Sequence, residues 1–226
     1  MIPQHAAWED IWAPIGLSLR VSLFASILVF LVGTYFAWKL ARARFPGKLL
    51  LETLFMLPLA LPPTVIGFLL LVLFGRRGPV GQLLERIFDY SLLFTPQAAV
   101  IASVVVAFPL MYQSAKTGFA GVDPDLEAAA RGLGATKRQI FFYVSLPLAW
   151  RSLLTGYLLG FARGLGEFGA TLMIAGNIPK VTQTLPMAIY LAVDQGKMTL
   201  AWFWTGATIF IAFVMILLTN RLRRKL

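Results

Sequence analysis

The sequence predicts an all-α polytopic membrane protein in which residues 1–226 form a single transmembrane domain. Hydrophobic residues make up 58% of the chain and charged residues 13%, against about 45–50% and about 25% in an average globular protein. Five apolar stretches come close to the ~20 residues that a helix needs to cross a bilayer. Lys and Arg gather beside these stretches. The composition excludes an ordinary soluble enzyme, a disordered chain and a secreted scaffold.

The apolar stretches predict five transmembrane helices. They cover approximately residues 17–40, 49–74, 98–115, 152–172 and 200–219. The second span contains Pro58, Pro62 and Pro63. Because proline has no backbone N–H and its ring clashes with the preceding turn, this span is predicted to be kinked.

The distribution of cations predicts the orientation. With five crossings and the first loop inside, 12 of the 20 Lys and Arg lie on the inner side (39, 42, 44, 48, 116, 131, 137, 138, 221, 223, 224 and 225). The positive-inside rule then places the N-terminus outside a bacterial inner membrane and the C-terminus in the cytoplasm. The net charge of +10 thus belongs to membrane flanks and does not indicate nucleic-acid binding.

Two further segments are predicted on the outer side. Residues 1–15 contain Trp8 and Trp12, and indole rings favour the membrane interface. Residues 173–199 are moderately apolar but interrupted by Gly and Pro, which favours an outer loop with a short re-entrant helix near residues 187–193. The alternative, a sixth crossing, would leave the two basic flanks on opposite sides of the membrane.

No catalytic or metal-binding constellation is present in the sequence. The chain has no Cys, a single His, and no G-x-x-x-x-G-K-[ST] phosphate loop. We therefore expect no catalytic residue, no metal ligand and no cofactor in this chain.

The loop of residues 117–147 is predicted to form two short cytoplasmic helices. Asp123 is placed to cap the first helix, and Gly134 suits a left-handed residue after its end. Thr136 and Gln139 have the spacing of a capping box for the second helix, which Pro147 is expected to end. In the first helix, an apolar stripe at helical spacing consists of Leu126, Ala129, Ala130 and Leu133.

This loop resembles the EAA loop of permease subunits of binding-protein-dependent ABC importers. The match places the motif's alanines on Ala129 and Ala130 and its glutamate position on Ala128, with Glu127 one residue early. In that family the loop is a coupling helix that docks into a groove on a separate ATPase subunit. The residues that the resemblance assigns to ATPase coupling are Glu127, Ala128, Ala129, Ala130, Leu133, Gly134, Leu146 and Pro147.

Further stretches resemble molybdate permease subunits in particular. They are FPGK (45–48), LPLALPPTVIGFLLL (57–71), FGRRGPVG (74–81) and FARGLGEFGATLMIAGNIP (161–179). Tungstate and sulfate or thiosulfate permeases share much of the last segment, so the oxyanion stays open. The resemblance implies a type I ABC importer permease fold, a homodimer of this chain, two ATPase subunits that bind ATP and Mg, and an external oxyanion-binding protein.

Two charged residues lie within the fourth span, Arg163 and Glu167. An ionised group at the centre of a membrane helix costs roughly 2.5–3.5 kcal/mol on insertion scales, so this pair is expected to face the bundle or a wet path. The alternative is that the pair only ties the span to its neighbours. Asn177 and Pro179, just outside this span, resemble an outer gate. A passive anion channel is the rival function, but it would leave the coupling loop without a role.

Overall fold

The structure is a computed structural model that describes residues 8–225. Within this range the regular elements are all helical, in the order α1 Trp8–Ala41, α2 Lys48–Ala60, α3 Pro63–Phe74, α4 Pro79–Phe88, α5 Pro96–Ala120, α6 Pro124–Gly132, α7 Lys137–Ile140, a π-helical turn η1 Phe141–Ser145, α8 Leu146–Leu165, α9 Gly169–Ala175, α10 Leu185–Asp194 and α11 Met198–Lys225. The predicted all-α class is confirmed.

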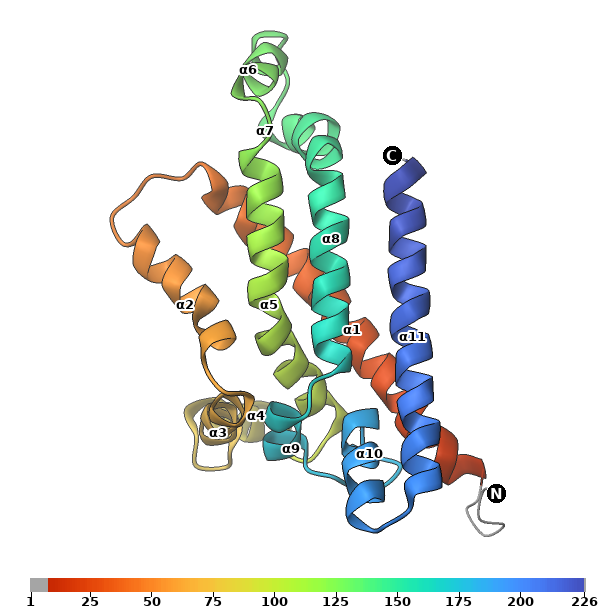
Figure 1. The fold of residues 1–226 in the computed structure, drawn as a ribbon. Helices are drawn as coiled ribbons and strands as arrows, with labels where there is room; N and C mark the ends of the chain where they lie inside the picture. The colour runs from red at the N-terminus through yellow and green to blue at the C-terminus, as the bar shows by residue number, and fades with distance from the viewer. Residues whose placement is uncertain (1–7, 226) are drawn as a thin grey trace.

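The centre of the molecule is a bundle in which α1, α5 and α8 pack against one another. The helix α1 crosses behind α5 and α8 at a steep angle, and α11 stands beside them (Figure 1). The helices α6 and α7 project at one end of the bundle, here called the α6 end. The end of α11 lies near this end, whereas α4, α9 and α10 lie at the opposite end with the start of α1 (Figure 1). The chain therefore makes an odd number of passes along the bundle.

Two of the five predicted spans are broken. The helices α2 and α3 differ in direction by 116°, and the helix that ends at Leu165 differs by 60° from α9. The first break falls at Leu61 and Pro62, as the prolines predicted, and the second at Gly166 to Phe168. Three unbroken helices, α1, α5 and α11, are long and apolar enough to cross a membrane. If each of the two bent pairs is counted as one span, the total is five.

The half-helices α3 and α9 pack closely against each other after the two breaks. A Cβ atom added to Gly67 of α3 would lie 2.8 Å from Ala170 Cα and 2.7 Å from Met173 Cβ, both on α9. A Cβ atom on Gly169 would similarly lie 3.1 Å from Pro63 Cβ. Glycine at these two positions permits a backbone approach that larger residues would prevent.

The loop of residues 117–147, here called the coupling loop after the resemblance, differs from its prediction in its second half. Pro147 does not end the second short helix, because the chain runs from α7 through η1 directly into α8. In η1 the amide of Leu146 donates to Phe141 O, five residues earlier, as in a π-helix. Pro147 then lies in the first turn of α8, where a missing backbone N–H is tolerated. The fourth span therefore begins before residue 152, the predicted start.

The outer-side predictions have mixed outcomes. The helix α10 contains 10 residues, too few to cross a bilayer, so the short helix predicted within residues 173–199 is confirmed. Residues 8–15 form the first part of α1, which runs from Trp8 to Ala41 without a break, and their placement at the membrane interface stays a prediction. The first seven residues of the predicted interfacial segment lie outside the described residues. The amphipathic helix α4 was not predicted.

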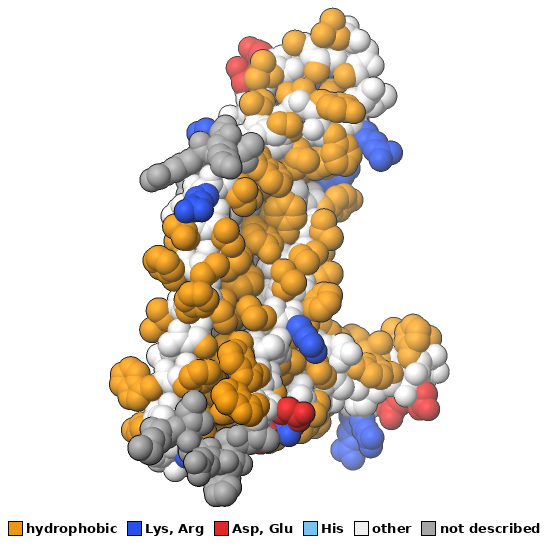
Figure 2. Space-filling view, turned by 90° about the vertical axis from the view of Figure 1, so that its right-hand side faces the viewer, with side chains coloured by type: hydrophobic (Ala, Val, Ile, Leu, Met, Phe, Trp, Pro, Cys, Tyr) orange, Lys and Arg blue, Asp and Glu red, His pale blue; other side chains and the backbone are white. Residues whose placement is uncertain are grey.

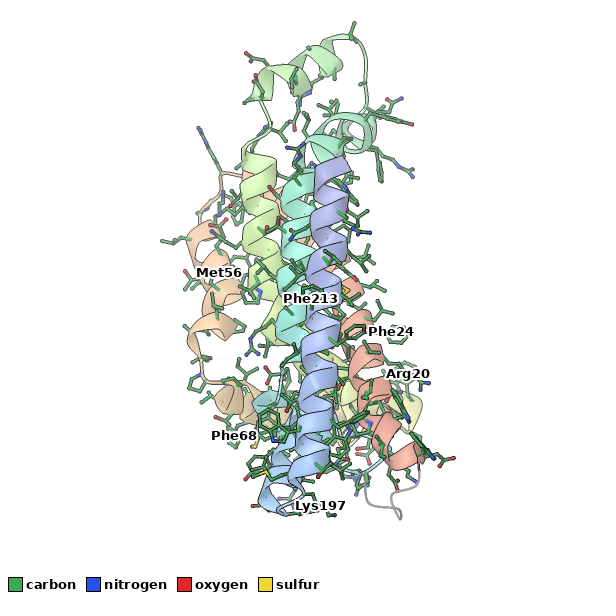
Figure 3. The ribbon with its side chains drawn as sticks, turned by 45° about the vertical axis from the view of Figure 1, so that its right-hand side comes forward. Arg20, Phe24, Met56, Phe68, Lys197 and Phe213 are labelled. Atoms are coloured by element: carbon green, nitrogen blue, oxygen red, sulfur yellow. The ribbon has the colours of Figure 1, made fainter. Side chains whose placement is uncertain are left out.

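The outer surface of the bundle is suited to lipid. Hydrophobic side chains cover most of the face formed around α11, and most of the charges visible there lie toward its two ends (Figure 2). Phe24 of α1 and Phe213 of α11, labelled in Figure 3, are 60% and 62% exposed. In water such a surface would be unfavourable, whereas in a bilayer it contacts acyl chains.

Candidate functional site

The coupling loop has the local structure that its sequence predicts. The amide of Asp125 donates to Asp123 Oδ1 at 2.9 Å, which caps α6. Gly134 has a left-handed φ of +87° just after the end of this helix. Thr136 and Gln139 form a capping box at α7, with Gln139 Oε1 accepting from the Thr136 amide at 2.8 Å. These local bonds give the loop a fixed shape at the α6 end of the bundle.

The apolar stripe of α6 is not covered by the rest of the chain. Leu126 is 49% exposed and Leu133 is 90% exposed. Ala129 is exposed as well, and no residue of α6 is buried. Ala128 is exposed but lies on the opposite side of the helix from the stripe, at 100° per residue. The stripe is therefore a small apolar surface that another protein can reach.

Glu127 does not lie on this stripe but faces the permease itself. Its Oε2 atom pairs with Arg42 Nη1 at 2.5 Å, and its Oε1 atom accepts from Ser145 Oγ at 2.7 Å. Arg42 follows the end of α1 and also donates to Val122 O, just before α6. Glu127 thus joins α6 to the end of α1 and to the segment that enters α8.

Leu146 and Pro147 are separated from the stripe by α7 and η1. Leu146 is half-buried against the core around α1, α5 and α8, and Pro147 is exposed in the first turn of α8. These two residues therefore belong to the base of the loop, whereas Ala129, Ala130 and Leu133 belong to its projecting part.

Arg163 and Glu167 form the predicted ion pair at the second helix break. Arg163 Nη1 lies 2.7 Å from Glu167 Oε2, and the Glu167 residue is 2% exposed. Glu167 Oε1 also accepts from the amide of Ala170 at 2.8 Å, near the start of α9. The carboxylate therefore fixes the junction of α8 and α9, while the Arg163 side chain keeps 30% of its surface exposed.

Asn177 and Pro179 lie in the connection between α9 and α10. The amide of Ile178 donates to Thr182 Oγ1 at 2.9 Å, which closes this loop on itself. Pro179 and Lys180 line a hollow of about 480 Å³ together with Trp204. Lys180 Nζ lies 2.9 Å from Asp10 Oδ1, and the hydrogen bond to Asp10 raises the pKa of Lys180 above its ordinary value. The loop is thereby tied to the start of α1.

One polar cluster was missed by the sequence analysis. Glu52 of α2 accepts from Tyr112 Oη at 3.1 Å and lies 2.7 Å from Lys116 Nζ, and both partners are on α5. Lys48 Nζ is 3.8 Å from the same carboxylate. Only the i,i+4 spacing of Lys48 and Glu52 could have been noticed in the sequence. The contact with α5 links residues 60 or more positions apart, and it holds α2 to the bundle.

Comparisons with known proteins place the chain in a transport family. The family described as the binding-protein-dependent transport system inner membrane component matches residues 29–226. The chain is 54% identical over 216 residues to the permease protein YvgM of Bacillus subtilis, which is assigned to molybdenum transport, and the match covers 96% of this chain and 95% of that protein. It is 45% identical over 183 residues to the molybdenum transport system permease protein ModB of Escherichia coli, with 81% and 80% of the two chains covered.

The fold is also that of a solved importer. A bacterial ABC transporter involved in the import of the polysaccharide alginate superposes with a TM-score of 0.77 at 17% identity, covering 97% of this chain and 81% of that chain. At this identity the likeness establishes the fold alone, which is the ABC importer permease fold that the coupling loop predicted. The activity of the chain follows from its family, whose members are membrane components of transport systems rather than enzymes. The chain belongs to the binding-protein-dependent transport system inner membrane component family.

Proposed function

We propose that this chain is the membrane-spanning subunit of an ATP-driven importer of molybdate. The observation that carries the proposal is the similarity to two relatives that are 54% and 45% identical and are assigned to molybdenum transport. The projecting coupling loop is consistent with it, because such a loop is exposed to a separate ATPase subunit. ATP and Mg bind to separate ATPase subunits in this proposal. An external binding protein delivers the oxyanion to the permease.

The coupling loop transmits the motion of the ATPase. The stripe of Leu126, Ala129, Ala130 and Leu133 docks on the ATPase, and its small alanine side chains permit close approach. Because Glu127 bonds to Arg42 and Ser145, displacement of α6 pulls on the ends of α1 and α8 together. ATP binding then moves the loops and opens the path outward, and hydrolysis resets it.

The oxyanion path lies between two copies of the chain. The helix α2 contacts α5 through Glu52, but none of its residues is fully buried in the single chain, and it lies at the edge of the bundle (Figure 1). A second copy placed against this side would enclose a path next to the two helix breaks. Arg163 and Glu167 lie at one break beside this path, and Asn177 and Pro179 form the gate at its outer mouth.

The proposed orientation puts the α6 end in the cytoplasm and the α10 end outside. The supporting observation is the number of cations near the α6 end, which includes Lys39, Arg42, Arg131 and Lys137. Cytoplasmic loops of inner-membrane proteins carry an excess of Lys and Arg. The same orientation brings the stripe of α6 to the compartment that contains ATP.

The proposal is tested with the permease and its ATPase reconstituted in liposomes. Binding protein loaded with molybdate, tungstate or sulfate is added in separate assays, and ATP hydrolysis and uptake are measured. We expect molybdate to stimulate both most strongly. Equal stimulation by sulfate would refute the substrate assignment, and rapid oxyanion flux without ATP would favour the channel.

A further inference from the structure

The proposed transport cycle assigns no ligand to a hollow beside the coupling loop. It measures about 390 Å³ and lies between the end of α1, the end of α5 and the inner side of α6 and α7. Its floor is apolar and includes Trp38, Phe119 and Ile140. Trp38 packs against Phe141 with their ring centroids 4.6 Å apart. The hollow therefore combines an aromatic floor with a rim contributed by three segments distant in sequence.

The rim of this hollow is strongly cationic. Lys39, Arg131 and Lys137 line it together with the Arg42–Glu127 pair. Arg42 and Glu127 neutralise each other, whereas the other three cations form no ion pair with a carboxylate among the residues whose side chains are described, 8–222. The hollow thus presents three uncompensated positive charges, which favour an anionic ligand.

The same hollow lies at the end of a lipid-facing stripe on α1. Exposed apolar side chains recur at i+4, i+3 and i+4 along this helix at Phe24, Leu28, Leu31 and Tyr35. The next position on that face is Lys39, whose Nζ atom lies 5.9 Å from the Tyr35 ring centroid and 4.8 Å from that of Trp38. Lys39 therefore holds its charge where an apolar surface for acyl chains meets the cationic rim.

We infer that this hollow binds the headgroup phosphate of an anionic phospholipid. Lys39, Arg131 and Lys137 contact the phosphate, Trp38 contacts the glycerol region, and one acyl chain follows the exposed stripe of α1. Basic pockets beside membrane helices bind anionic headgroups in this way. A bound lipid would join α1 to α6 and α7, so that the position of the coupling loop would depend on the lipid composition.

An acidic side chain of the ATPase is a less suitable occupant. Arg131 lies one turn after Glu127, on the side of α6 that faces α1. At 100° per residue, Leu126 and Leu133 of the exposed stripe lie about 140–160° from Arg131 around the helix. A partner that docks on the stripe leaves the hollow open toward the membrane surface.

The experiment measures lipid retention by the full-length permease in mixed detergent micelles. Phosphatidylglycerol and phosphatidylcholine with the same acyl chains are supplied in equal amounts, and the lipids that copurify are quantified by mass spectrometry. We expect the wild type to enrich phosphatidylglycerol. Replacement of Lys39, Arg131 and Lys137 by Gln should lower the enrichment about fivefold for each cation removed.

A matched control removes the same charge from other exposed positions. The triple variant Arg44→Gln, Arg138→Gln and Arg221→Gln changes three cations that do not line the hollow and should keep the wild-type enrichment. Equal retention of the two lipids by the wild type, or equal losses in the two triple variants, would refute the inference. The inference is also wrong if the Lys39, Arg131 and Lys137 variant keeps the lipid preference of the wild type.

The single variants Lys39→Gln and Lys137→Gln keep the test decisive if the triple variant does not fold. Both side chains are exposed, so neither substitution disturbs the packed core. Each should lower phosphatidylglycerol enrichment about fivefold while leaving the helical circular dichroism signal unchanged. Unchanged enrichment in both single variants would reject the site. Because lipid retention is measured without ATP or oxyanion, this result is independent of the proposed transport function.

Discussion

Glu127 and Ser145, 18 positions apart, share a hydrogen bond of 2.7 Å between Ser145 Oγ and Glu127 Oε1. The other oxygen of the same carboxylate pairs with Arg42. Glu127 is thus held by two segments of the permease, although its sequence position is next to the glutamate position of an ATPase-coupling motif. This geometry assigns to Glu127 the task of holding α6 in place.

The first prediction concerns this attachment of the loop. Glu127→Gln should keep the Ser145 hydrogen bond but lose the charge that pairs with Arg42, at a cost of about 1 kcal/mol for a partly exposed pair. We expect uptake per ATP hydrolysed to fall by about fivefold, with the ATPase still bound. The control, Asp125→Asn, removes a charge from the same helix and should transport normally. Equal defects in the two variants would contradict this role.

The second prediction tests the docking face of α6. Ala129→Asp places a charge in a contact of small apolar groups, and an unpaired buried charge costs several kcal/mol unless the interface opens. The ATPase should copurify poorly, or should hydrolyse ATP without driving uptake. Ala128→Asp, on the opposite side of α6, should have a smaller effect. Normal uptake and normal ATPase retention in Ala129→Asp would show that the stripe does not dock.

The third prediction concerns the junction of α8 and α9. Glu167→Gln keeps a carbonyl oxygen that can accept from the Ala170 amide, whereas Glu167→Leu removes that acceptor and leaves Arg163 unpaired. Loss of one partner of a fully buried pair costs about 3–5 kcal/mol, and the cost is smaller here because Arg163 keeps 30% of its side chain exposed. We therefore expect Glu167→Leu to unfold at a clearly lower temperature in detergent than Glu167→Gln. Equal melting temperatures would place the carboxylate in lipid or water.

The fourth prediction tests the contact between α3 and α9. Gly67→Ala adds a Cβ atom that would lie 2.8 Å from Ala170 Cα, so one helix must move. Overpacking of this kind costs about 1–3 kcal/mol. Gly16→Ala in α1 is the matched control, because its added Cβ meets no atom within 4 Å. Thermal unfolding should separate the two variants, and an unperturbed Gly67→Ala would indicate that α3 and α9 are not in close contact.

The fifth prediction concerns topology. An alkaline phosphatase reporter fused after Lys225 should be inactive because it stays in the cytoplasm, and a tag at Met1 should be accessible from outside. The reason is that the described chain makes an odd number of passes and its basic flanks favour the inner side. Accessibility of both ends from one side would reject the five-span topology.

Much of the fold could be predicted because its signals are local in sequence. The cap at Asp123, the left-handed Gly134 and the capping box of Thr136 and Gln139 each involve residues that are at most a few positions apart. The spans were likewise predictable, since burial in lipid requires long apolar segments. The break at Leu61 and Pro62 follows from proline chemistry in the same way.

The candidate site depends on contacts that no local pattern encodes. Arg42 reaches Glu127 from 85 positions away, and Lys116 reaches Glu52 from the far end of α5. The sequence by itself determined which segments are helical and apolar, because helix formation and transfer to lipid depend on neighbouring residues. Only the tertiary structure decided which charges meet, because the partners of a long polar side chain are set by how the helices cross and where the chain breaks.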